Sequence, residues 1–285
     1  MSRKDSLFQV KNTLNLRGNL ESLDRPWVMG ILNITPDSFY AASRMEQPRS
    51  LLDQAEKMLA EGAKILDIGG YSSRPGADHI SEKEELERVV PAIRAVMQEF
   101  PDTYISIDTF RAEVARAAVG EGAAIVNDIS GGNLDEQMYP TVAELKVPYI
   151  LMHMKGSPQN MVKNTEYEHL VHEVYGYFSQ KVGQLYSLGV SDIILDPGFG
   201  FAKTREQSYE LLRNLGYFKH IKLPLLAGMS RKSMIYKELG TTPEEALNGT
   251  TALNMIALIN GASILRVHDI KPAVEAVKLF KATYT

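Results

Sequence analysis

The sequence repeats one pattern eight times: a short apolar run, a polar or glycine-bearing loop, and then residues with helical spacing. The runs are apolar almost throughout instead of alternating, which is typical of parallel strands covered on both faces. They are Val28–Ile34, Ile65–Gly69, Tyr104–Asp108, Ala124–Ile129, Tyr149–His153, Ile193–Asp196, Leu225–Gly228 and Ile264–Val267. Eight such units in a chain of this length predict an α/β fold, a single (β/α)8 TIM barrel, which typically takes about 250 residues.

Helix signals lie between the runs. Apolar residues three and four apart over 86–97 and over 170–185 predict two amphipathic helices. Ser81 and Glu84 form the pattern of a capping box before the first. Pro272 suits the first turn of the last helix.

The domain organisation follows from this pattern. Residues 25–285 are expected to form the barrel as one structural domain. Residues 1–24 precede it, and within them Phe8–Leu23 is expected to form a β-hairpin that caps the bottom of the barrel.

Composition excludes several classes of protein. The 285 residues contain no cysteine, so disulfides and cysteine-bound zinc are excluded. A net charge of −4 gives no electrostatic reason to expect nucleic acid. No run approaches the roughly 18 apolar residues that span a membrane, and residues 1–30 lack the apolar core of a signal peptide. We expect a cytoplasmic protein with small-molecule partners.

Polar residues and glycines gather at the C-terminal ends of the predicted strands. In a (β/α)8 barrel these ends meet at one rim, where active sites are built. We therefore expect eight separate segments to converge on one pocket. Its candidate residues are Asn33, Asp67, Asp108, Asn127, His153, Asp196, the segment Ser230–Ser233, Arg266 and His268.

The chemistry of this set indicates one class of ligand. Asp108, Asn127 and Asp196 can bind the edge of a flat heterocycle that carries amino and ring N–H groups. Arg266 and His268, two residues apart on one strand, offer donors to an anion. The amide oxygen of Asn33 could hold Mg²⁺ beside phosphate oxygens. Acids at one end and cations at the other suit a basic heterocycle with a phosphate ester.

Each residue also has a simpler interpretation. Asp108 could cap the following helix, Asp196-Pro-Gly could be only a turn, and Asn33 could belong to a turn. Other simple interpretations are a surface ion-pair cluster for Arg266, His268 and Asp269, a solvated Lys232, core positions for Met152 and Phe201, hydrogen-bonded packing for His153, an exposed helix face for Glu82–Arg88, and solvation for His169 and His172. Joint occurrence at one rim favours the site.

Seven segments in order resemble the dihydropteroate synthase family, from about Leu14 to near the C-terminus. They are Met29–Phe39, Asp67–Gly76, Ser106–Thr109, Asn127–Ile129, Asp196–Phe201, Ser230–Ser233 and Arg266–Asp269. The resemblance implies a transferase of folate biosynthesis, a sulfonamide target that is commonly dimeric. Its members join a dihydropterin pyrophosphate to 4-aminobenzoate and release pyrophosphate.

The resemblance also implies roles for individual residues. Asp108, Asn127, Asp196 and Lys232 would bind the pterin, with Met152, Phe201 and Gly228 lining its slot. Asn33 would ligate Mg²⁺, and Asn33, Ser73, Arg266 and His268 would hold the pyrophosphate. Arg74, Pro75, Phe201 and Ser233 would form the aminobenzoate site. Asp108, Lys232, Arg266 and His268 would be the catalytic residues.

Two loops depart from the family pattern. Many members have Asp-Gly-Gly where this chain has Ala41-Ala42-Ser43, which puts a loop-closing carboxylate contact in doubt. Many have Glu-Ser-Thr where this chain has Tyr71-Ser72-Ser73, a milder change because Ser73 keeps a hydroxyl.

Three other functions compete with this interpretation. A methyltransferase domain that acts on methyltetrahydrofolate could share the pterin residues, but it would not need the anion-binding pair of segments. A phosphosugar aldolase would use Lys232 as a Schiff base, and no sequence feature beside it suggests a depressed pKa. A non-catalytic paralogue that binds pterin is supported only by the altered first loop.

Overall fold

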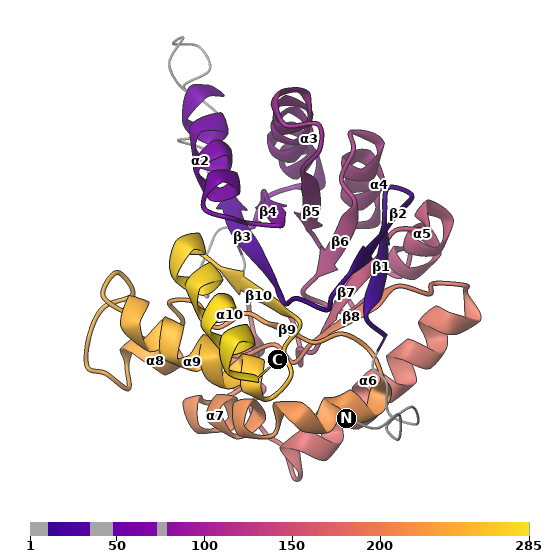
Figure 1. The fold of residues 1–285 in the computed structure, drawn as a ribbon. Helices are drawn as coiled ribbons and strands as arrows, with labels where there is room; N and C mark the ends of the chain where they lie inside the picture. The colour runs from indigo at the N-terminus through magenta and orange to yellow at the C-terminus, as the bar shows by residue number, and fades with distance from the viewer. Residues whose placement is uncertain (1–10, 35–47, 73–78, 285) are drawn as a thin grey trace, which may run out of the picture.

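Eight parallel strands form a barrel in the computed structural model, which describes residues 11–34, 48–72 and 79–284 (Figure 1). The strands are β3 (Trp27–Asn33), β4 (Ile65–Gly69), β5 (Tyr104–Asp108), β6 (Ile125–Asp128), β7 (Tyr149–Met152), β8 (Ile193–Asp196), β9 (Leu226–Ala227) and β10 (Ile264–Val267). Their hydrogen-bonded order is β8-β7-β6-β5-β4-β3-β10-β9. A parallel bridge between Leu195 and Leu225 joins the two ends of this sheet. The predicted barrel is confirmed, with strand ends shifted by at most one residue.

Helices cover the outside of the barrel (Figure 1). They are α2 (Pro48–Ala60), α3 (Glu82–Glu99), α4 (Ala112–Gly120), α5 (Met138–Leu145), α6 (Leu170–Ser187), α7 (Arg205–Arg213), α8 (Ser233–Tyr236), α9 (Leu247–Ile259) and α10 (Ile270–Tyr284), with 3-10 turns η3 (Met161–Lys163) and η4 (Leu215–Ile221). Pro272 lies in the first turn of α10, as predicted. Among the described helices, none is long and apolar enough to cross a membrane.

The start of α3 confirms one helix signal and corrects another. The Ser81 hydroxyl caps the helix by accepting a hydrogen bond from the backbone N–H of Glu84 at 3.1 Å. In a capping box the side chain of Glu84 would reach back to the backbone N–H of Ser81. Here it pairs with Arg88 at 2.5 Å instead. The expectation that 82–88 is an exposed face is wrong for Glu85, whose side chain is fully buried and pairs with Arg111 at 2.5 Å. Burial raises the pKa of Glu85, although Arg111 acts in the opposite direction.

The N-terminal hairpin is present, formed by β1 (Thr13–Leu16) and β2 (Asn19–Ser22). Arg17 and Gly18 form its turn, both with positive φ, and the side chain of Asn15 accepts from the Gly18 N–H at 2.9 Å. Leu14 and Leu16 are fully buried against the N-terminal ends of the barrel strands. The hairpin therefore closes the bottom of the barrel, as the sequence predicts.

The barrel interior is built in layers. Beneath the hairpin contacts lies an apolar layer with one residue from each strand: Met29, Ile65, Tyr104, Ile125, Ile150, Ile194, Leu226 and Ile264. Because strand side chains alternate, the next inward residue on each strand lies two positions further along. Those residues are Ile31, Asp67, Ser106, Asn127, Met152, Asp196, Gly228 and Arg266. We call the first set the lower layer and the second the upper layer. Several members of the upper layer are charged or polar.

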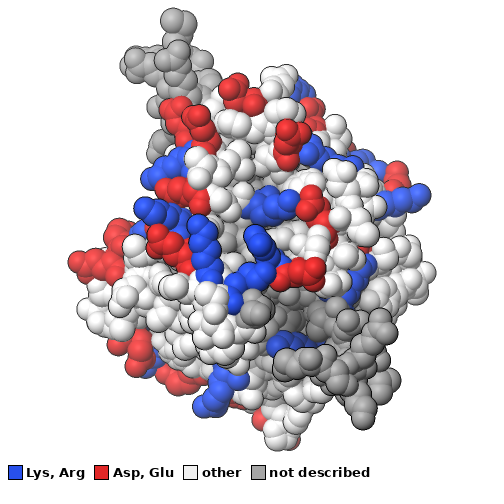
Figure 2. Space-filling view, viewed as in Figure 1, with Lys and Arg blue, Asp and Glu red and all other residues white. Residues whose placement is uncertain are grey.

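The outer face that carries the hairpin differs from this interior. Figure 2 shows Lys and Arg interspersed with Asp and Glu across that face, with no broad area of one sign.

Candidate functional site

Arg266 lies at the centre of the upper layer, between two carboxylates. Its Nε donates to Asp67 Oδ2 at 2.6 Å, and its Nη2 donates to Asp108 Oδ2 at 2.5 Å. Asn127 Nδ2 also donates to Asp67, at 3.1 Å. Four different strands therefore meet in one hydrogen-bonded group. Gly69 permits this approach, because a Cβ atom there would lie 3.2 Å from Cβ of Asp108.

The electrostatics of this group follow from burial. Burial raises the pKa of Asp108 to about 7, and the Asp67 carboxylate adds to the rise while Arg266 opposes it. Burial disfavours the charged guanidinium of Arg266, but Asp67 and Asp108 outweigh it and raise the pKa of Arg266. Arg266 therefore stays charged, while Asp108 can gain or lose a proton near neutral pH.

Asp196 and Lys232 form the adjacent part of the mouth. Asp196 Oδ1 accepts the backbone N–H of Gly198 at 2.8 Å. Lys232 Nζ donates to the carbonyl oxygen of Phe199 at 2.8 Å and lies 4.5 Å from the centre of the Phe201 ring. Burial lowers the pKa of Lys232 to about 8, with Asp196 acting against the shift. Burial also raises the pKa of Asp196.

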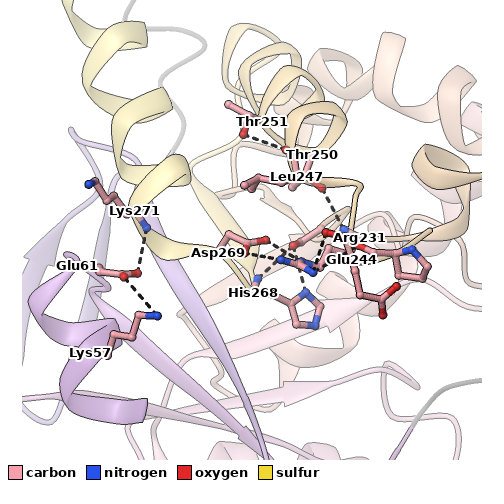
Figure 3. Close-up of polar contacts among 12 residues, drawn as sticks. Lys57, Glu61, Arg231, Glu244, Leu247, Thr250, Thr251, His268, Asp269 and Lys271 are labelled. Carbon is pink, nitrogen blue, oxygen red and sulfur yellow. Dashed lines mark hydrogen bonds and ion pairs between the residues drawn. The ribbon is translucent and has the colours of Figure 1, made fainter. Parts of the chain in front are cut away.

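A second polar group joins the loop after β9 to the end of β10 (Figure 3). Ser230 Oγ accepts from the backbone N–H of His268 at 3.1 Å and lies 3.1 Å from His268 Nδ1. Arg231 binds Asp269 with two parallel hydrogen bonds of 2.8 and 2.7 Å. Such bidentate pairs fix geometry as well as charge. The ion pair considered for Asp269 is therefore made with Arg231, not with Arg266.

A cavity of about 330 Å³ lies on the outer side of His268, between α2 and α10. It is lined by Gln54, Lys57, Met58, Glu61, His268, Asp269, Lys271 and Pro272. Figure 3 shows Glu61 between Lys57 and Lys271; Glu61 Oε1 lies 4.0 Å from Lys57 Nζ, and its Oε2 3.4 Å from the backbone nitrogen of Lys271. His268 therefore lines this cavity and, through Ser230, contacts the loop after β9.

Apolar side chains form the opposite wall of the mouth. Phe110, Ile129, Met152, Met154, Met161 and Ala202 make a cluster separate from the main core, with Tyr71 and Phe201 packed on it. The Tyr71 ring meets Phe110 edge-on at 5.0 Å, and its hydroxyl accepts from Gln159 Nε2 at 2.5 Å. Tyr71 thus links the loops after β4, β5 and β7. The mouth therefore has an apolar wall beside its buried charges.

Comparison with known proteins identifies the family. Residues 29–268 match the family model described as pterin binding enzyme. The chain is 47% identical over 263 residues to the dihydropteroate synthase of Synechocystis, covering 91% of both chains. It is 43% identical over 270 residues to that of Escherichia coli K12, covering 94% of this chain and 95% of the relative. The chain belongs to the dihydropteroate synthase family.

Solved structures of the family have the same fold. The Yersinia pestis dihydropteroate synthase in complex with a sulfonamide drug superposes with a TM-score of 0.87 at 41% identity, covering 95% of this chain and 98% of that one. The Xanthomonas albilineans enzyme in complex with 7,8-dihydropteroate gives a TM-score of 0.84 at 34% identity, with the same coverage.

In this family member, the structure brings most of the candidate residues to one mouth. Asp108, Asn127, Asp196, Lys232 and Arg266 lie together, and Met152 and Phe201 share the apolar wall. Gly228 faces Arg266, with room for a Cβ atom at 3.8 Å. Asn33 ends β3 with an exposed side chain beside Gly69, and Ser233 begins α8, also exposed. Ser73, Arg74, Pro75 and Ala41-Ala42-Ser43 lie outside the described residues.

Two expectations about these residues are wrong. Acids and cations do not occupy opposite ends of the site, because Arg266 lies between Asp67 and Asp108. Lys232 does have a depressed pKa, because the surrounding loops bury it. The simpler interpretation of Asp108 as a helix cap also fails, since the Asp135 carboxylate accepts from the first N–H of α4 at 2.7 Å.

The sequence interpretation assigned no role to Asp67 or Lys203. Asp67 is the central acceptor of the upper layer, with only 1% of its surface exposed. Asp67 lies two residues after Ile65, which faces the barrel interior. Strand alternation therefore predicts that Asp67 faces inward too. Lys203 is buried at the end of the loop after β8, where it contacts His153. Sequence periodicity gives no sign of such a contact.

Metal-binding candidates are few in the described part of the chain. No group of three or more His, Cys, Asp or Glu residues there could hold a metal. His169 and His172 are exposed, with ring centres 6.1 Å apart. A single exposed amide oxygen, as at Asn33, fits a Mg²⁺ ion that takes most of its ligands from water and phosphate.

Proposed function

We propose that this chain condenses 6-hydroxymethyl-7,8-dihydropterin pyrophosphate with 4-aminobenzoate, giving 7,8-dihydropteroate and pyrophosphate. It acts as a transferase in folate biosynthesis. The observation that carries the proposal is the buried group of Asp67, Asp108, Asn127 and Arg266 beside Asp196 and Lys232. The relatives named dihydropteroate synthase match along nearly the whole chain, which favours this activity over a methyltransferase domain.

The pterin ring would bind across the upper layer. Asp108, Asn127 and Asp196 present oxygen acceptors to its amino and ring N–H groups, and the Asn127 amide and Lys232 supply donors. Met152 and Phe201 would contact its flat face, and Gly228 leaves the space it needs. The dihydropterin is a weak base, so buried carboxylates stabilise positive charge that develops on it.

The pyrophosphate would lie toward Arg266 and His268. A guanidinium has five N–H donors, and the bonds to Asp67 and Asp108 use two of them, so Arg266 can also bind phosphate oxygens. Ser73 would add a hydroxyl, and Asn33 would hold Mg²⁺ against the phosphates. When bound, the ion neutralises charge on the departing pyrophosphate.

The reaction then proceeds by charge separation. The bond between the pterin methylene carbon and the pyrophosphate oxygen breaks, and its electron pair leaves with the oxygen. Asp108 and Asp196 stabilise the resulting pterin cation, while Arg266 and His268 stabilise the leaving group. The neutral amine of aminobenzoate attacks the methylene carbon, and its nitrogen then loses a proton. No nucleophile from the protein is required.

The aminobenzoate would bind between the pterin and the outer loops. Phe201 and Ser233 would form its inner boundary, with Lys232 alongside. Arg74 and Pro75, in the segment that follows β4, would complete the site. Aminobenzoate carries a carboxylate, for which an arginine and a serine hydroxyl are suitable partners.

A coupled binding and turnover assay tests the function. Pyrophosphate release from the dihydropterin substrate should be accompanied by product formation only when 4-aminobenzoate is present. It should reach its full rate only with Mg²⁺. Asp108→Asn should bind pterin but lower turnover by about 100-fold, because it removes one stabilising charge. Pterin binding without pyrophosphate release by the wild-type chain would instead indicate a non-catalytic paralogue, and unchanged turnover of Asp108→Asn would refute the electrostatic mechanism.

We also propose that the chain forms a homodimer through α9 and α10. These helices pack on each other, and Ile256, Ile259, Leu279 and Tyr284 expose apolar surface on them. Burial of such residues between two copies would stabilise a symmetric dimer. Sedimentation equilibrium should give the mass of two chains, and the mass of one chain would refute the dimer.

A further inference from the structure

The loop after β8, residues 197–203, positions part of the catalytic mouth. The carbonyl oxygen of Phe199 accepts from Lys232 Nζ at 2.8 Å, and the Phe201 ring lies 4.5 Å from the same nitrogen. The location of the Lys232 ammonium therefore depends on the conformation of this loop.

The backbone of the loop turns through left-handed conformations, one of them at a residue other than glycine. Gly198, Gly200 and Ala202 all have positive φ, at +69°, +77° and +50°. Glycine adopts positive φ readily, so the strain lies at Ala202, whose Cβ crowds the neighbouring carbonyl oxygen in this conformation. A Cβ atom at Gly198 would lie 2.2 Å from the carbonyl oxygen of His153, so the loop is pressed against the end of β7. Such a backbone persists only where surrounding contacts hold it.

Lys203 provides those contacts from a buried position. Its Nζ lies within hydrogen-bond distance of the carbonyl oxygens of Gly198 at 3.1 Å, Phe201 at 2.9 Å and His153 at 3.1 Å. It also lies 2.9 Å from His153 Nδ1. Burial lowers the pKa of Lys203 to about 7, and Asp196 acts against this shift. Carbonyl oxygens only accept and an ammonium has three N–H donors, so it is the protonated form of the lysine that matches the three carbonyls. One side chain thus joins both halves of the loop to β7.

His153 is suited to this contact. It is 3% exposed, and its ring meets the Tyr177 ring edge-on at 4.8 Å. Burial and the nearby Lys203 charge hold the pKa of His153 well below its usual value. A neutral imidazole can accept a share of a Lys203 N–H through Nδ1, whereas a charged one would repel the ammonium.

We propose that Lys203 is a positioning residue for the reaction, acting through the 197–203 loop on Lys232. The expected loss of activity rests on the proposed function, whereas the expected release of the loop does not. Lys203 contacts the backbone that presents Phe199 and Phe201, and these two residues contact Lys232. Loss of the Lys203 ammonium is expected to release the loop and leave Lys232 misplaced at the pterin site.

Lys203→Met tests the proposal, because methionine keeps an unbranched chain but has no donor. Lys155→Met is the matched control: Lys155 also holds a loop, donating to the carbonyl of Glu166 and to Glu173 at 2.7 and 2.8 Å. In Lys203→Met, kcat/KM for the dihydropterin substrate should fall by about 10- to 100-fold, as expected for a displaced catalytic group. Amides 198–202 should exchange hydrogen faster, while those of β7 keep their protection. Lys203→Arg should recover much of the activity.

The outcomes separate the two proposals. If the wild-type chain releases no pyrophosphate, the proposed function fails, yet amide exchange and pterin binding still report on Lys203. Wild-type exchange and wild-type pterin affinity in Lys203→Met would overturn the positioning role. So would a loss of kcat/KM equal in Lys203→Met, Lys203→Arg and Lys155→Met. If Lys203→Met does not fold, Lys203→Gln, which keeps two N–H donors, should show the same changes to a smaller degree, and wild-type behaviour would refute the role.

Discussion

The lower and upper layers of the barrel interior come from the same strands but have opposite chemistry. Ile65 and Asp67 are two residues apart on β4, and Ile264 and Arg266 are two apart on β10. The lower layer is apolar and capped by the hairpin, whereas the upper layer contains paired charges. Strand residues two apart are separated by about 6.6 Å. The barrel therefore changes from a stabilising core to a chemical site within one strand repeat.

This difference indicates what each layer contributes. Burial of apolar side chains in the lower layer stabilises the fold by about 1.5–3 kcal/mol for each large residue. Buried ion pairs in the upper layer offset their own desolvation at best. The group around Arg266 is therefore expected to add little net stability. Its presence at the mouth is therefore better explained by function than by stability.

The largest expected effect comes from truncating the lower layer. Ile194 is fully buried there, two residues before Asp196. Ile194→Ala should lower the free energy of unfolding by about 2–5 kcal/mol, because it removes buried methylenes and leaves a cavity. Denaturant unfolding measures this loss. The folded variant should keep kcat within about threefold of wild type; a loss of activity without a loss of stability would show that the two layers are not separable.

The layered interior was largely predictable from sequence, but the pairing within it was not. Apolar runs ending in polar residues located the strands, and so placed Asp108, Asn127 and Asp196 at one mouth. Periodicity gives the face and height of a side chain, but not its partner across the barrel. The bonds from Arg266 to Asp67 and Asp108 depend on how four strands tilt together. The expectation of acids and cations at opposite ends failed for that reason.

The contact of Lys203 with His153 could not be predicted from the sequence for a different reason. The two residues are 50 positions apart, and Lys203 lies in a loop with no periodic pattern. A lysine in a loop is ordinarily exposed, and the left-handed residues that turn this one inward are not encoded by spacing alone. Lys232 illustrates the same limit, because it lies in the loop before α8 and the neighbouring loop after β8 contacts it.

The next effect in size concerns the upper layer. Arg266→Met should lower kcat/KM for the dihydropterin substrate by about 100- to 1000-fold, equivalent to about 3–4 kcal/mol of transition-state stabilisation. Asp67 and Asp108 would then face each other without their cation, so both would tend to bind protons. Steady-state kinetics and urea unfolding on the same preparation give the comparison. An unfolding loss larger than that of Ile194→Ala, with kcat/KM near wild type, would reverse the roles assigned to the two layers.

The smallest effect is a pH dependence at the mouth, from Lys232 beside the upper layer. The pKa of Lys232 is about 8, below that of a free lysine, because burial disfavours its charge. The ammonium is therefore present below that pH and lost above it, and with it the donor proposed for the pterin. In the free enzyme, kcat/KM for the dihydropterin substrate should fall about tenfold per pH unit above this pKa.

Lys232→Arg, which keeps its charge, should have a lower plateau without this alkaline limb. Ile194→Ala should retain the limb at the wild-type position, since the lower layer contributes no charged residue to this titration. An alkaline limb that persists unchanged in Lys232→Arg would assign the titration to another group, such as Lys203, whose pKa burial also lowers.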